Sequence, residues 1–174
     1  MSTETETGLA ELADLLVQCP PFDSLSEADR ARAVAAAHIE QYQPGDLILD
    51  AFATMPTAIG LVTSGEINLW FDRERIGEEP ADKFSRGTPI GFTAVLAGQP
   101  VGPRIEAKTT VVVAHLPSEI VIPAFASRGG ARFLADQIAH VRGLTATAPR
   151  YTLLSDLVYR DPLVVRADES VTAL

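Results

Sequence analysis

The chain has 174 residues, of which 47% are hydrophobic and 21% are charged, and its formal net charge is −9. This length supports one globular domain with its own core and a short appendage. The acidic excess disfavours nucleic-acid binding, which draws most of its affinity from basic side chains that neutralise phosphates. The apolar runs are far shorter than the ~20 residues of a membrane span, so we expect no membrane partner.

The first residues favour a cytoplasmic protein. Residues 1–8 are polar and acidic, and they have neither the basic start nor the apolar centre of a secretion signal. We expect this segment to be disordered. The single cysteine, Cys19, can form no internal disulfide, and its neighbours Val17 and Pro20 favour a packed small hydrophobe over a nucleophile.

Two helices are predicted near the N-terminus. Leucines recur at helical spacing from Leu9 to Val17, and the pattern stops before Pro20. Ser26 is a suitable N-cap for a second helix over residues 26–37, because the alanine-rich sequence that follows it has high helix propensity.

Short extended segments follow, separated by turn residues. We expect strands at Ile39–Gln43 and Leu47–Leu49, then a hairpin of Ala58–Thr63 and Glu66–Phe71 closed at Ser64–Gly65. The charged segment Asp72–Ala81 is predicted to be an exposed loop between strands.

The last part of the expected domain returns from strand to helix. Residues Ile105–Leu116 form the strongest strand candidate, Pro117 ends it at a turn or short helix, and residues 131–144 have helical spacing. Many short strands bracketed by helices predict a mainly β fold with flanking helices, of the jelly-roll or β-roll type.

The order of these segments resembles that of the cyclic-nucleotide-binding domain, the sensory module of the catabolite activator family and of several kinases and channels. The resemblance covers residues 9–145 and is carried by four segments: Cys19–Ser26, Gln43–Asp46, Ile59–Ile67 and Arg86–Gly91. It implies a double-stranded β-helix flanked by helices.

The resemblance also places a ligand cassette at residues 91–108, but the ligand-binding residues are replaced. In the family a Gly-Glu pair holds the ribose hydroxyl and an arginine pairs with the cyclic phosphate. Here Phe92 follows Gly91, and the arginine position, six residues before Ala107, falls on Val101. The short cassette helix, whose backbone N–H groups would face an anion, is expected to persist.

We therefore expect a degenerate pocket that binds cyclic AMP or cyclic GMP weakly or not at all, with no other cofactor. The candidate pocket residues are Gly91, Phe92, Thr93, Ala94, Pro103 and Arg104. Arg104 could be a displaced substitute for the phosphate arginine. The alternative that we favour is an ion pair with a surface carboxylate such as Glu106 or Asp82, because Arg104 is three residues from Ala107, an odd number of strand positions from Val101.

The C-terminal residues resemble a second family. Segments Thr152–Val158, Asp161–Val165 and Ala167–Val171 are similar to the opening of a cystathionine-β-synthase (CBS) domain, so residues 146–174 are expected to be a linker and the truncated start of such a domain. The combination resembles bacterial signalling proteins that continue with paired CBS domains and a nucleotidyltransferase-like domain. In that arrangement this chain would regulate and would not catalyse.

Other chemistry has less support. The histidines at positions 38, 115 and 140 lack the paired spacing of a metal site, and neither a P-loop nor a nucleophile elbow is present, so we assign no catalytic or metal residue. The favoured function is a non-enzymatic regulatory module that acts through neighbouring domains or through a homodimer formed by residues 131–144. The alternatives are a genuine cyclic-nucleotide or other small-ligand sensor that uses the same pocket, and a metal enzyme of the cupin kind.

Overall fold

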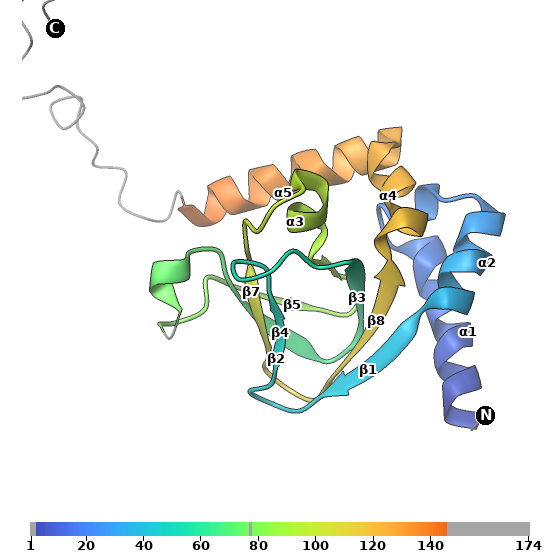
Figure 1. Cartoon of the computed structure of the whole chain (residues 1–174), viewed down its shortest axis with the longest axis horizontal. Helices are drawn as coiled ribbons and strands as arrows, with labels where there is room; N and C mark the ends of the chain where they lie inside the picture. Colours follow the sequence, from blue (N-terminus) through green and yellow to red (C-terminus); the bar gives the residue numbers. More distant parts are fainter. Residues whose placement is uncertain (1–2, 77, 146–174) are drawn as a thin grey trace, which may run out of the picture. The chain divides into compact units, whose positions relative to one another are not determined.

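The computed structural model describes residues 3–76 and 78–145 (Figure 1). The larger of two compact units extends to Ala139, and the contacts described below lie within it. Its helices are α1 (Thr3–Gln18), α2 (Glu27–Ala36), α3 (Phe92–Ala97), α4 (Ser118–Ala126) and the first part of α5 (Arg128–Thr145), with 3-10 turns η1 (Phe22–Ser24) and η2 (Arg73–Arg75). Within the described residues, no helix is long and apolar enough to span a bilayer. The segment that resembles a CBS domain lies outside them.

Two antiparallel four-stranded sheets form the centre of the fold. The first has the order β1-β8-β3-β6, made of His38–Tyr42, Val111–Pro117, Ala58–Ser64 and Pro89–Ile90. The second has the order β2-β7-β4-β5, made of Leu47–Asp50, Arg104–Ala107, Glu66–Trp70 and Asp82–Ser85. The prediction of a mainly β jelly roll with flanking helices is confirmed.

The predicted hairpin at Ser64–Gly65 is wrong. Strand β3 pairs with β6 and β8 in the first sheet, whereas β4 pairs with β5 and β7 in the second. Gly65 has a φ of +87°, as expected for a turn, but a Cβ at this position would collide with the backbone of Thr110. The turn therefore carries the chain from one sheet to the other, and alternation of apolar residues cannot distinguish this connection from a hairpin.

The predicted single strand over Ile105–Leu116 is also wrong, because it is two strands in different sheets. Residues 108–110 interrupt it, and the backbone N–H groups of Lys108 and Thr109 donate to the carbonyl of Glu66. The Thr109 hydroxyl accepts from the N–H of Glu66. These contacts hold a corner that a continuous β-branched sequence does not reveal.

The N-terminal helix begins earlier than predicted. Helix α1 starts at Thr3, so residues 3–8, expected to be disordered, are helical. The segment contains no proline but only two good helix formers, Glu4 and Glu6, so its helix is sustained mainly by the packing of the apolar face that follows. The predicted cap of α2 is confirmed, since the Ser26 hydroxyl accepts from the N–H of Asp29 at 3.1 Å.

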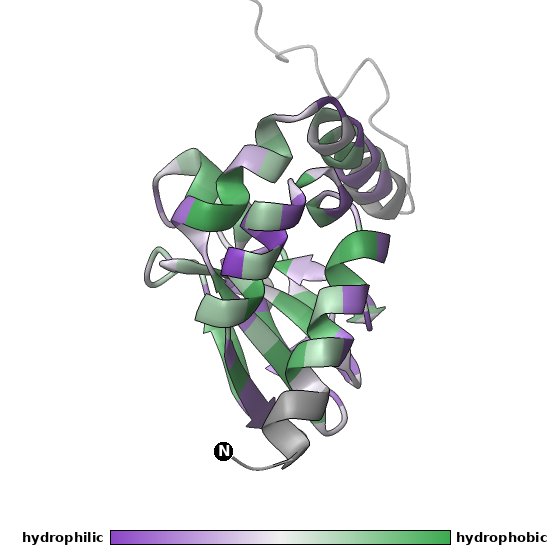
Figure 2. Ribbon diagram, turned by 90° about the vertical axis from the view of Figure 1, so that its right-hand side faces the viewer, coloured by the Kyte–Doolittle hydropathy of each residue, from purple (hydrophilic) through white to green (hydrophobic). Residues whose placement is uncertain are grey.

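The core has two parts. One lies between the two sheets and includes Ile67, Ile105 and Val113. The other lies between the outer face of the first sheet and the helices, where Leu16 and Phe22 pack with Leu116. Figure 2 shows mainly hydrophobic strand ribbons and helices that carry both hydrophobic and hydrophilic stretches. The helices are thus held to the sheet by burial of their apolar faces.

Candidate functional site

The predicted cassette helix exists as α3, directly after β6. Gly91 precedes it with a φ of +80°, and a Cβ there would lie 3.3 Å from Leu49, so glycine fits both the backbone and the space. The Thr93 hydroxyl donates to the carbonyl of Gly102 at 3.0 Å. This hydrogen bond joins the start of α3 to the segment where the family places its phosphate arginine.

Phe92 points into the core and is only 9% exposed. Its ring stacks on Phe125 of α4, with centroids 5.4 Å apart, and meets Phe133 of α5 edge-on, also at 5.4 Å. Phe125 and Phe133 also contact each other. In Figure 1 α5 passes over α3, in agreement with these contacts. We call the three rings the aromatic cluster; it joins the cassette to both C-terminal helices.

Only a small pocket remains beside the cassette. It has a volume of about 40 Å³ and is lined by Gly91, Phe92, Thr93 and Pro103 together with apolar strand residues such as Leu69 and Phe84. The expected residues Ala94 and Arg104 do not line it, and Ala94 is fully buried. A volume of 40 Å³ admits a few water molecules, whereas pockets for ligands of ordinary size are ~300–1,000 Å³.

Arg104 faces away from this pocket. Along β7 the inward side chains are Ile105 and Ala107, and Arg104 alternates with them onto the outer face of the second sheet. Its Nε and Nη2 lie 2.9 and 2.8 Å from Oε1 of Glu106, and its Nη1 lies 3.4 Å from Oδ2 of Asp50. The expected pairing with Glu106 is confirmed, and Asp50 on β2, the strand neighbour of Arg104, is a partner that the sequence did not indicate.

Val101 and the adjacent Gly102, where the resemblance places the phosphate arginine, carry no cationic side chain. Val101 is 44% exposed, and Gly102 has a φ of +83° with the ring of Phe52 where its side chain would begin. No cationic side chain lines the 40 Å³ pocket within the described part of the chain. A phosphate placed there would meet apolar side chains and the uncharged polar residues Thr88, Thr93 and Gln137, but no opposite charge.

Two histidines that are distant in sequence lie side by side. His38 on β1 and His115 on β8 are register partners, and their rings stack with centroids 6.4 Å apart. Burial lowers the pKa of His115; the nearby His38 adds to this effect, and Glu40 opposes it. Among residues 3–76 and 78–145, no group of three His, Cys, Asp or Glu side chains could hold a metal ion.

Sequence reasoning missed the residues that explain the cassette. Phe125 and Phe133 are spaced like ordinary core positions of helices, so only the fold shows that they surround Phe92. The β2–β7 pairing that brings Asp50 to Arg104 likewise depends on a long-range register. For Arg104, the alternation of inward and outward side chains along β7 predicted correctly that it faces outward.

Comparison with known proteins supports the fold. No protein-family model and no curated protein sequence matches the chain. Among solved structures, a cAMP-bound PfPKA-R is similar, with a TM-score of 0.63 and 13% identity over 82% of this chain and 48% of that chain. The regulatory domain of Toxoplasma gondii PKA with cAMP is also similar, with a TM-score of 0.59 and 20% identity over 68% of this chain and 45% of that chain.

A third similar structure is the regulatory subunit of a cAMP-independent protein kinase A from Trypanosoma cruzi bound to guanosine. It has a TM-score of 0.58 and 15% identity over 80% of this chain and 52% of that chain. The chain thus spans about half the length of these three structures. At such identities the similarity concerns the backbone arrangement alone. The chain therefore has the jelly-roll fold of cyclic-nucleotide-binding domains.

Proposed function

We propose that this chain is a regulatory module of a larger signalling protein and that it acts through interdomain or dimer contacts without binding cyclic AMP or cyclic GMP in the usual way. The observation that carries the proposal is the position of Phe92. A buried ring joined to two helices stands where the family has the ribose-binding carboxylate.

The aromatic cluster suggests how such a module works. In a ligand-controlled cassette, the bound nucleotide determines how the cassette meets the helices that follow. Here Phe92 makes that connection itself, since its ring contacts α4 and α5 directly. Because packed cores resist continuous deformation, a displacement of α5 by a neighbouring domain would be passed to α3. The module would thus transmit movements between α5 and α3 without a bound ligand.

The partners follow from the second resemblance. The similarity of residues 152–171 to the opening of a CBS domain supports paired CBS domains and a nucleotidyltransferase-like domain as the neighbours, in a cytoplasmic bacterial protein. The solved structures with a similar fold include regulatory domains and subunits, which supports a role without catalysis.

Calorimetry tests the proposal directly. The full chain is titrated with cyclic AMP, cyclic GMP and cyclic dinucleotides, and no saturable heat is expected up to millimolar ligand. An Arg104→Ala variant serves as the comparison. Micromolar binding that Arg104→Ala abolishes would overturn the proposal and favour the sensor alternative, in which Arg104 replaces the missing phosphate arginine.

A homodimer through α5 is the second contact that we propose. Phe133 and Leu134 pack against the core, whereas Ile138 on the same helix is 59% exposed. Replacing Ile138 with lysine should weaken self-association without loss of core packing. Light scattering of both proteins over a wide concentration range checks this, and a monomeric mass of the wild-type chain throughout would refute it.

A further inference from the structure

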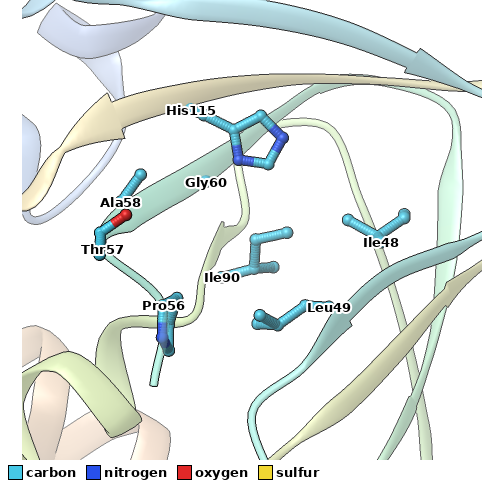
Figure 3. A pocket seen from close by; sticks show the side chains of 8 residues that line it. All are labelled: Ile48, Leu49, Pro56, Thr57, Ala58, Gly60, Ile90 and His115. Carbon is cyan, nitrogen blue, oxygen red and sulfur yellow. The ribbon is translucent and has the colours of Figure 1, made fainter. Parts of the chain in front are cut away.

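A second cavity, about half open to solvent, lies between β2 and the β3–β6–β8 part of the first sheet. Its volume is about 240 Å³, six times that of the cassette pocket. Figure 3 shows its walls: Ile48 and Leu49 from β2, Ile90 from β6, His115 from β8, and the segment from Pro56 to Gly60. The cavity does not include Gly91, Phe92 or Thr93, so it differs from the site predicted from the sequence, although Ile90 lines both.

The lining is apolar apart from the Thr57 side chain and the His115 ring. Of the charged residues in the described part of the chain, none lines it. A charged ligand would lose its hydration there without gaining an opposite charge, which is costly. The cavity therefore selects neutral molecules.

Hydrogen bonds fix which nitrogen of His115 carries the proton. The Tyr42 hydroxyl lies 2.8 Å from Oε2 of Glu40 and 3.0 Å from Nε2 of His115. A carboxylate oxygen only accepts, so the hydroxyl hydrogen goes to Glu40 and the hydroxyl oxygen accepts from Nε2–H. Because burial disfavours the charged imidazolium, the other nitrogen, Nδ1, is an acceptor.

This acceptor is available to a ligand. Nδ1 of His115 has no hydrogen-bond partner among the described residues. Among the described residues, Oδ1 of Asn68 is the one fully buried side-chain nitrogen or oxygen that lacks a hydrogen-bond partner. Nδ1 of His115 also lacks a partner, so it must be accessible to solvent. A hydroxyl group inside the cavity can donate to it and extend the series of hydrogen bonds through Tyr42 to Glu40.

We infer that this cavity is a binding site for a small neutral aromatic molecule with one hydroxyl donor, of the phenol class. Size supports the aromatic part, because an apolar cavity of ~150 Å³ suffices to bind benzene in another protein and 240 Å³ leaves space for a substituted ring. The Nδ1 acceptor supports the hydroxyl, and the absence of a lining cation among the described residues disfavours a carboxylate. The inference is independent of cyclic-nucleotide binding.

The test is a titration of the full chain with phenol, toluene and benzoate, followed by NMR. Phenol should bind saturably at millimolar concentration or below, and toluene at least about fivefold more weakly because it lacks one hydrogen bond. Benzoate should not bind. Saturable shifts should be confined to amides that line the cavity, such as those of Ala58 and Gly60.

Three variants locate the site. Ala58→Leu places bulk in the cavity and should weaken phenol binding at least tenfold, whereas Ala35→Leu makes the same change on the exposed face of α2 and should leave it unchanged. His115→Leu should remove the preference for phenol over toluene. The inference is overturned if the folded wild-type chain shows no saturable phenol binding at millimolar concentration, if toluene or benzoate binds as well as phenol, or if Ala58→Leu has no effect.

Discussion

Replacing Phe92 with alanine should destabilise the fold by about 4 kcal/mol. The side chain is 9% exposed, and truncating an aromatic ring removes roughly 150 Å² of buried apolar surface, which at ~25 cal/mol/Å² amounts to about 4 kcal/mol. Loss of the ring contacts with Phe125 and Phe133 adds to this value, and partial closure of the resulting cavity reduces it. Since domains of this size are stable by ~5–15 kcal/mol, the variant should fold but unfold at much lower denaturant concentration.

Urea unfolding measured by tryptophan fluorescence tests this value, because the chain contains one tryptophan, Trp70, and it is buried. Leu96→Ala is the matched control. Leu96 lies on the same short helix but is 41% exposed, so its truncation should cost less than about 1 kcal/mol. Equal and small losses for both variants would refute the claim that Phe92 fastens the cassette to the C-terminal helices.

Four further outcomes are expected. Val101→Arg should not create cyclic AMP binding in calorimetry, because the adjacent pocket, with a volume of about 40 Å³, is too small for a nucleotide. Micromolar affinity would contradict this. Arg104→Gln should lower the unfolding free energy by about 1 kcal/mol in urea, with little further loss when combined with Glu106→Gln, because the two groups act as a pair; additive losses would count against the pair. Burial lowers the pKa of His115 below its ordinary value of 6.5, so the unfolded chain takes up more protons than the folded chain as the pH falls below 6.5, and stability declines. His115→Gln should make this decline less steep in urea midpoints measured from pH 7 to 5. An identical slope for the variant and the wild-type chain would contradict the prediction. Burial also raises the pKa of the Cys19 thiol, so at pH 8 it should react with a disulfide reagent more slowly in the folded than in the urea-unfolded chain, and equal rates would be inconsistent with a packed thiol.

The sequence predicted the element types better than their pairing. The α2 cap at Ser26 and the break near Pro20 depend on local geometry, which neighbouring residues determine. The connections at Gly65 and at residues 108–110 depend on which sheet each strand joins, and that choice is made by contacts between distant segments. Alternation of apolar residues reports a buried face but not the partner strand.

The candidate site shows the same division. Counting residues along the resembling segment predicted that the family's carboxylate and arginine are replaced, and the alternation of β7 indicated that Arg104 faces outward. The packing of the Phe92 ring could not be predicted, because its neighbours Phe125 and Phe133 come from helices more than thirty residues further along the chain. The hydrogen bonds from His115 to Tyr42 also required the β1–β8 register.

The most direct test of the central claim is an NMR titration of the full chain with cyclic AMP, observed at the backbone amides of the cassette. The resemblance places a cyclic phosphate near Gly91, Thr93 and Gly102, and the Thr93 hydroxyl donates to the carbonyl of Gly102. We expect their amide signals to remain unchanged up to millimolar ligand. Saturable shifts centred on these three residues would show that the cassette holds a nucleotide and would contradict a regulatory role without cyclic-nucleotide binding.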